Sequence, residues 1–144
     1  MAELQGHRGY IGSRSYFGDR TPQHVQNLVV RDFCQRNGLL FLISATEYIM
    51  DGCYVMLEEV MTELPKIDGI VLYSIFMLPT DAGHRQDIYR RVLSAEVDIS
   101  GAVENLRIQS EADIQTVEDI WAIKNITESD ISEIKNLARI IDTE

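Results

Sequence analysis

Hydrophobic positions follow two spacings along the chain. Short apolar runs, typical of buried strands, occur at 8–12, 39–45, 67–74 and 97–103. Between them, apolar residues recur every three or four positions, which predicts amphipathic helices at 22–36, 53–64 and 84–96. Pro22 suits the first turn of the first helix, and Pro65 ends the second. We therefore expect strands and helices to alternate from residue 8 to residue 103.

Strands that alternate with helices of this length are joined by parallel crossovers. The predicted fold class is α/β, with a mainly parallel four-stranded sheet covered by helices on both faces. Two more amphipathic helices, starting near Ser110 and Thr127, are expected to close the chain as a helical pair. Residues 1–109 would form the core domain, and 110–144 a helical extension that packs on that domain or on a second subunit.

Composition limits the classes of function. The chain has 144 residues, 45% of them hydrophobic, and a formal charge of −10, which is typical of one globular domain and argues against nucleic-acid partners. Two cysteines make no disulfide framework, and without CxxC or HExxH motifs we expect no metal and no cofactor. The polar N-terminal residues and the short apolar runs predict a cytoplasmic protein with no membrane partner.

The charge is unevenly distributed. Residues 1–40 carry five arginines against three acids, so residues 41–144 hold all of the negative excess. A local positive field on an acidic protein favours a small anion over a polyanion.

The segment after the first strand is the candidate anion site. Gly12 and Gly18 allow close backbone approach, and a helix that begins after Thr21 presents free N–H groups. Arg14 and Arg20 could add bidentate contacts to a phosphate or carboxylate. The segment is neither a Walker loop nor a GxGxxG loop, and an ordinary strand-to-helix turn explains it equally well.

Polar residues concentrate where the predicted strands end. In a parallel sheet these ends share one rim, where ligands bind. The rim candidates are Ser13, Arg14, Arg20, Gln23, His24, Ser44, Thr46, Glu47, Tyr73, Ser74, Glu104 and Asn105.

Several of these side chains could perform catalysis. His24 could exchange protons with Glu47 or Glu104 as its partner, although a lone histidine is also a common surface or capping residue. Cys53, at a predicted helix start, could be a nucleophile, but it also begins an apolar stripe and so fits an inert buried thiol. Ser13 is the other candidate nucleophile.

Two resemblances follow from these residues. The strand ending in Tyr10-Ile11-Gly12-Ser13, the long helix after it and the fourth strand ending at Glu104 resemble the catalytic domain of serine recombinases. That resemblance puts Ser13 in the place of the nucleophile and Glu104 in that of the carboxylate. Those enzymes need arginines just after the third strand, where this chain has Tyr73-Ser74-Ile75-Phe76-Met77-Leu78, so strand cleavage is not expected.

The second resemblance extends over nearly the whole chain. Five sequence blocks resemble the bacterial sporadic carbohydrate cluster proteins: RGYIGSR, PQHVQNLVVRDFC, SATEYIMDGCYVMLEEV, IDGIVLYSIFMLP and VEDIWAIK. The resemblance implies a role in surface-polysaccharide biosynthesis and a sugar-linked anionic ligand, without a settled reaction. It favours as site residues Arg14, Gln23, His24, Asn27, Thr46, Glu47, Cys53 and Ser74.

The hypothesis from sequence is a small protein of bacterial surface-carbohydrate biosynthesis, an enzyme or an accessory protein. It would bind an anionic or nucleotide-linked sugar through residues Arg14, Arg20, Gln23, Asn27, Thr46, Tyr73 and Ser74. The catalytic candidates are Ser13, His24, Glu47, Cys53 and Glu104. The alternative is a non-catalytic partner or regulator in a glycan-biosynthesis complex. We expect a homo-oligomer, a dimer or higher, because residues 110–141 carry more apolar positions than covering one sheet face requires.

Overall fold

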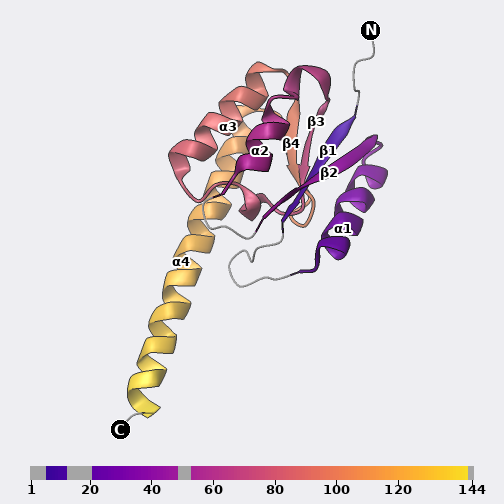
Figure 1. Cartoon of the computed structure of the whole chain (residues 1–144). Helices are drawn as coiled ribbons and strands as arrows, with labels where there is room; N and C mark the ends of the chain where they lie inside the picture. The colour runs from indigo at the N-terminus through magenta and orange to yellow at the C-terminus, as the bar shows by residue number, and fades with distance from the viewer. Residues whose placement is uncertain (1–5, 13–20, 49–52, 143–144) are drawn as a thin grey trace.

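The computed structural model describes residues 6–12, 21–48 and 53–142 (Figure 1). The strands of the described chain are β1 His7–Gly12, β2 Phe41–Glu47, β3 Gly69–Leu72, β4 Asp98–Gly101 and β5 Leu106–Ile108. The α-helices are α1 Gln23–Arg36, α2 Val55–Met61, α3 Ala82–Ser94 and α4 Glu111–Asp142. Two 3-10 turns, η1 Leu64–Lys66 and η2 Ile75–Met77, stand on either side of β3.

The strands form one mixed sheet in the order β2-β1-β3-β4-β5. β2, β1, β3 and β4 are parallel, and β5 runs antiparallel to β4. The α/β class is confirmed, but the predicted mainly parallel sheet of four strands is wrong, because the sheet is mixed and has five strands. The predicted strand 97–103 in fact turns back after Gly101, and Asn105, with φ of 56°, accepts the left-handed backbone of that turn. β5 has three residues, too few for a hydrophobic period to reveal it.

The helices cover both faces of the sheet, as predicted. Figure 1 shows α1 on one side and α2 and α3 on the other, with the first turns of α4 beside α3. The core between these layers contains fully buried aromatic side chains from β1, α1 and α4: Tyr10, Phe33 and Trp121.

α4 is one continuous helix of 32 residues, so the predicted helical pair is wrong. Thr127 does not cap a second helix, because its hydroxyl donates a hydrogen bond to the Ile123 carbonyl within the same helix. No glycine or proline interrupts 111–142. The first turns bury Ile114, Val117 and Trp121, whereas the rest projects beyond the body of the domain (Figure 1). Among the described helices, none combines the length and apolar character that crossing a membrane requires.

An ion pair between buried Arg85 and half-buried Glu118 fixes the first turns of α4 to α3. The Arg85 guanidinium donates to both carboxylate oxygens of Glu118, at 2.8 and 2.9 Å, and lies over the Trp121 ring. The Tyr89 hydroxyl donates to the same carboxylate at 2.8 Å. Burial raises the pKa of Glu118, but the hydrogen bonds from Arg85 and Tyr89 outweigh that effect, so its pKa lies below the usual value.

Candidate functional site

Gln26 anchors the chain where β1 ends. Its side chain is buried, and its amide nitrogen donates to the Gly12 carbonyl at 2.8 Å and to the Thr21 carbonyl at 2.7 Å. Its amide oxygen accepts from the Gly12 N–H at 3.0 Å. One side chain therefore holds both ends of the 13–20 segment. The candidates Ser13, Arg14 and Arg20 belong to that segment and lie outside the described residues.

Tyr73 also reaches this point from β3. Its hydroxyl donates to the Thr21 hydroxyl at 3.1 Å, and the ring is nearly buried. The contact joins the end of β3 to the start of α1, so Tyr73 lies at the rim where the sequence predicts it.

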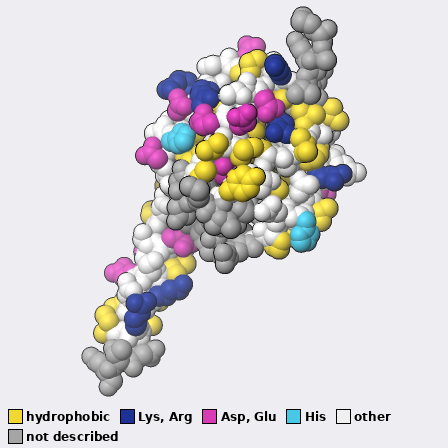
Figure 2. Space-filling view, viewed as in Figure 1, with side chains coloured by type: hydrophobic (Ala, Val, Ile, Leu, Met, Phe, Trp, Pro, Cys, Tyr) yellow, Lys and Arg dark blue, Asp and Glu magenta, His cyan; other side chains and the backbone are white. Residues whose placement is uncertain are grey.

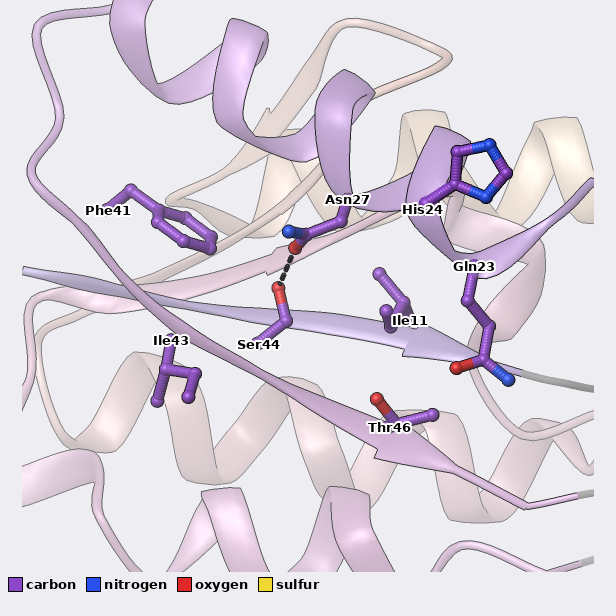
Figure 3. Close-up of a pocket in the computed structure, with 8 residues that line it drawn as sticks. All are labelled: Ile11, Gln23, His24, Asn27, Phe41, Ile43, Ser44 and Thr46. Carbon is purple, nitrogen blue, oxygen red and sulfur yellow. Dashed lines mark hydrogen bonds between the residues drawn. The ribbon is translucent and has the colours of Figure 1, made fainter.

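A groove opens between α1 and the edge strand β2 (Figure 3). Its volume is about 650 Å³. Four of the predicted site residues line it: Gln23, His24, Asn27 and Thr46. The remaining lining residues are Ile11, Phe41, Ile43 and Ser44, of which Ser44 is also a predicted rim residue. We call this feature the α1–β2 groove.

The α1–β2 groove has an aromatic end and a polar end. Figure 3 shows Phe41 at one end, Asn27 and Ser44 in the middle, and Gln23 and Thr46 at the other end. The Ser44 hydroxyl donates to the Asn27 amide oxygen at 2.6 Å. Hydroxyl and amide groups beside apolar side chains suit a polar ligand that also has an apolar face.

Gly9 on β1 allows the middle of the groove to form. A Cβ at this position would lie 2.2 Å from Ser44 Oγ and 3.1 Å from the Phe41 ring. Only glycine lets Ser44 and Phe41 lie over β1 in their present positions.

Glu47 lies on the other side of β2, because neighbouring residues of a strand point to opposite faces. Its side chain is 0% exposed, and its carboxylate accepts from the Tyr10 hydroxyl at 2.8 Å. The Met56 and Leu57 N–H groups donate to it at 3.1 and 3.2 Å, so it holds the first turn of α2. Glu47 therefore does not share the α1–β2 groove with His24.

Cys53 belongs to the Glu47 group. Its half-buried thiol donates to a Glu47 carboxylate oxygen at 3.7 Å. The second cysteine, Cys34, is buried in α1, and burial raises the pKa of its thiol to about 11. Cys34 is therefore a core residue, as the sequence indicated.

Ser74 and Glu104 form a third group, after β3 and β4. The Ser74 hydroxyl and the Ile75 N–H donate to the two oxygens of Glu104, at 2.7 and 2.9 Å. The Phe76 N–H donates to Ser74 Oγ at 3.1 Å. Glu104 thus joins the turn after β4 to the first residues of η2.

The predicted site residues are thus divided among separate places. Gln23, His24, Asn27 and Thr46 share one groove. Glu47 with Cys53 and Ser74 with Glu104 form two other hydrogen-bonded groups at the strand ends. Sequence reasoning missed Phe41, which the apolar run 39–45 made look like core. It also missed Gln26, whose position in the helix gave no sign that it was buried.

The amino ends of the strands carry a different buried cluster. The carboxylate of Asp98 on β4 accepts from His7 Nε2 at 2.8 Å and from the Arg107 guanidinium at 2.7 Å. Burial raises the pKa of Asp98, but the hydrogen bonds from His7 and Arg107 outweigh that effect and hold its pKa below the usual value of an aspartate. The cluster lies far from the strand-end rim, at the opposite ends of the same strands.

Comparison with known proteins shows the fold. The chain is similar to the crystal structure of the N-terminal catalytic domain of TP901-1 integrase, with a TM-score of 0.60 and 13% sequence identity. The match covers 86% of this chain and 98% of that domain. No protein-family model matches the sequence, and the search of curated proteins found no match. The chain therefore has a resolvase-like α/β fold, as the first resemblance implied.

Proposed function

We propose that this protein binds a sugar that carries a phosphate, a carboxylate or a nucleotide, and that the α1–β2 groove holds the sugar ring. The observation that carries the proposal is that Gln23, His24, Asn27 and Thr46 line one groove together with Phe41. Sugars present hydroxyl groups at their edges and C–H groups on their faces. Amides and hydroxyls would bind the edges, and the apolar side chains would pack against a face.

The anionic group would bind to Arg14 and Arg20. Gln26 holds the two ends of their segment at Gly12 and Thr21, and the groove-lining residues Ile11 and Gln23 lie close to those ends in sequence. A guanidinium can bind a phosphate or carboxylate through two hydrogen bonds. The acidic remainder of the chain would disfavour a polyanion.

Glu47 and Glu104 stabilise backbone elements, which favours ligand binding by this rim over proton transfer by its two carboxylates. Glu47 and Glu104 each accept a hydrogen bond from at least one backbone N–H, and they position α2 and η2. His24 is exposed beside the groove, which makes it the candidate for proton transfer to a bound sugar. The resemblance to sporadic carbohydrate cluster proteins supports a role in bacterial surface-carbohydrate biosynthesis.

We do not propose DNA strand cleavage, which the shared fold alone cannot support. The chain after β3, Tyr73–Leu78, has no charged residue, and only Phe76 within it is more than marginally exposed. No cation in that stretch could stabilise a phosphoryl-transfer transition state.

A comparison of melting temperatures with and without ligand tests the proposal. Nucleotide sugars and sugar phosphates should raise the melting temperature, while the matching uncharged sugars should have a much smaller effect. Arg14→Ala should abolish the ligand-induced rise and leave the melting temperature without ligand nearly unchanged. Arg90→Ala, on an exposed part of α3, is the matched control and should behave like the parent chain. Equal stabilisation of Arg14→Ala and the parent would overturn the proposal.

A further inference from the structure

The pairing between β1 and the edge strand β2 has one irregularity, which lies beside the α1–β2 groove (Figure 2 shows the surface of the molecule from the same side as Figure 1). Arg8 of β1 pairs with Leu42, whereas the next residue, Gly9, pairs with Ser44. Ile43 is therefore an extra residue in β2, as in a β-bulge. It is 76% exposed. We call this irregularity the Ile43 bulge.

The Ile43 bulge decides which side chains of β2 face α1. In a regular strand, residues an odd number of positions apart point to opposite faces, so Phe41 and Ser44 would be separated. With the extra residue between them, Phe41 lines the groove together with Ser44 and Thr46. Figure 3 shows Ser44 pointing toward Asn27 and Ile43 pointing away from it. The aromatic end and the polar middle of the groove therefore share one face because of the bulge.

Contacts at the two ends of β2 prevent the strand from losing its extra residue by a shift along β1. Before the bulge, the His7 N–H donates to the Leu40 carbonyl at 2.7 Å. After it, the Tyr10 hydroxyl donates to the Glu47 carboxylate at 2.8 Å. Because both ends are fixed to β1, the segment between them has one residue more than a regular ladder needs. Where that residue is placed determines which side chains enter the groove.

Arg8 holds the extra residue at position 43. Its guanidinium donates a hydrogen bond from Nη1 to the Ile43 carbonyl. Its Nε lies 3.3 Å from a Glu63 carboxylate oxygen, and the Arg8 side chain is only 13% exposed. A Cβ on Gly9 would point at Ser44 Oγ on the α1 side, so Arg8, one residue earlier, points to the α2 side. Arg8 therefore acts from the face of the sheet opposite to the groove, where it does not meet a ligand.

We propose that Arg8 is a positioning residue for the α1–β2 groove. Through the Ile43 carbonyl it selects where β2 takes up its extra residue, and so it brings Phe41 onto the same face as Ser44 and Thr46. A charged donor suits this role, because its hydrogen bond to a carbonyl is stronger than that of a neutral donor. The effect of Arg8 on ligand affinity rests on the proposed function, whereas its effect on β2 does not.

Nuclear magnetic resonance of the full chain without ligand tests the effect on β2. A Cβ on Gly9 would lie 3.1 Å from the Phe41 ring, so the ring protons of the parent chain should give nuclear Overhauser effects to the Gly9 α protons. Arg8→Met keeps a long apolar side chain without the donor and should abolish this signal, and Arg8→Lys, which can donate one hydrogen bond, should keep part of it. Arg36→Met removes an arginine from an exposed ion pair and should leave the signal unchanged. An Arg8→Met chain with the signal of the parent would overturn the proposal.

Deletion of Ile43 distinguishes positioning from general stabilisation. Without the extra residue, β2 can pair regularly with β1, and Phe41 and Ser44 keep their faces. Arg8→Met should therefore lower the melting temperature of the deletion chain by less than half as much as it lowers that of the parent. Equal decreases in the two backgrounds would show that Arg8 only stabilises the fold, and would overturn the proposal. If Arg8→Met alone is unfolded, the deletion should restore a folded chain, and a double variant that stays unfolded would also overturn it.

Calorimetric titration with glucose 1-phosphate and uridine diphosphate glucose tests the consequence for binding. Arg8→Met should lower the affinity for a probe that binds the parent about tenfold, because Phe41 no longer packs against the sugar. A parent chain that binds neither probe would count against the proposed function, and the two tests on β2 would still decide the role of Arg8. Unchanged affinity in a variant that has lost the contact between Phe41 and Gly9 would overturn the positioning role.

Discussion

The two faces of β2 differ in exposure: one face lines an open groove and the other is buried. On the α1 side, Ser44 and Thr46 line an open groove. On the α2 side, Ala45 and Glu47 are buried, and the Glu47 carboxylate accepts hydrogen bonds from the Tyr10 hydroxyl and from two backbone N–H groups. Thr46 and Glu47, adjacent in sequence, therefore belong to different parts of the molecule.

Residues at the strand ends are therefore of two kinds: some stabilise the fold, and others are available to a ligand. A buried carboxylate whose partners are backbone N–H groups stabilises a helix start, and its loss would leave those donors without partners. A half-buried hydroxyl in a groove contributes little to folding but can bind a solute. Changes on the α2 face should therefore affect stability, and changes on the α1 face should affect affinity.

Glu47→Ala should have the largest effect. The Tyr10 hydroxyl and the first N–H groups of α2 would lose their buried acceptor, which should lower the free energy of unfolding by about 4 kcal/mol. Urea denaturation followed by circular dichroism measures the loss.

Glu47→Gln is the conservative control for that change. Its amide oxygen can accept some of the same hydrogen bonds, so the free energy of unfolding should fall by about half as much as in Glu47→Ala. Ligand affinity, measured where each variant is fully folded, should stay close to that of the parent. A large drop in affinity without a drop in stability would show that Glu47 contacts the ligand.

Asp98, like Glu47, is a buried carboxylate, but its partners are the side chains of His7 and Arg107. Its pKa is lower in the folded protein than in the unfolded chain, so its contribution to stability is complete above the unfolded-state pKa and is lost as the pH falls through the folded-state value. Asp98→Asn should cost about 2 to 3 kcal/mol near neutral pH. That difference from the parent should shrink in urea titrations as the pH falls below about 4. Parallel pH profiles for the two chains would show that the Asp98 charge contributes nothing.

Hydrophobic spacing was enough to predict the α/β class and the helices on both faces, because amphipathic helices alternate with apolar strands along the chain. It failed where elements are short or where local signals mislead. β5 has only three residues, and Thr127 resembled an N-cap although its hydroxyl is satisfied within α4. Without a glycine or proline, nothing in the sequence stops α4 at that position.

The sequence predicted that the candidate residues lie at the strand ends, but not which face of the sheet each side chain is on. Thr46 was expected beside Glu47, yet the alternation along β2 separates them, and only the position of α2 shows which face is closed. Gln26 was missed because its burial depends on Gly12 and Thr21, which tertiary structure brings together. Phe41 was expected in the core because the apolar run gives no sign that β2 is an edge strand.

Gly9→Ala should disturb the groove face by a moderate amount. The new methyl group would displace Ser44 Oγ and break its hydrogen bond to Asn27, which should lower the free energy of unfolding by about 1 to 2 kcal/mol. A double-mutant cycle with Ser44→Ala identifies the cause. If the clash with Ser44 Oγ dominates, the double variant should be more stable than the sum of the two single changes predicts. Strict additivity would place the strain elsewhere.

Thr46→Val should have the smallest effect on folding and so separates the two faces of β2 most clearly. Valine keeps the shape of threonine and removes the hydroxyl from a half-buried position, so the free energy of unfolding should change by no more than about 0.5 kcal/mol. The affinity for an anionic sugar should fall about tenfold, because one hydrogen bond to the ligand is lost. Thr116→Val, on the exposed side of α4, is the matched control and should leave calorimetric titrations unchanged. If both threonine variants bind as the parent does, the sugar does not contact the α1 face of β2, and the ligand site must be sought elsewhere on the rim.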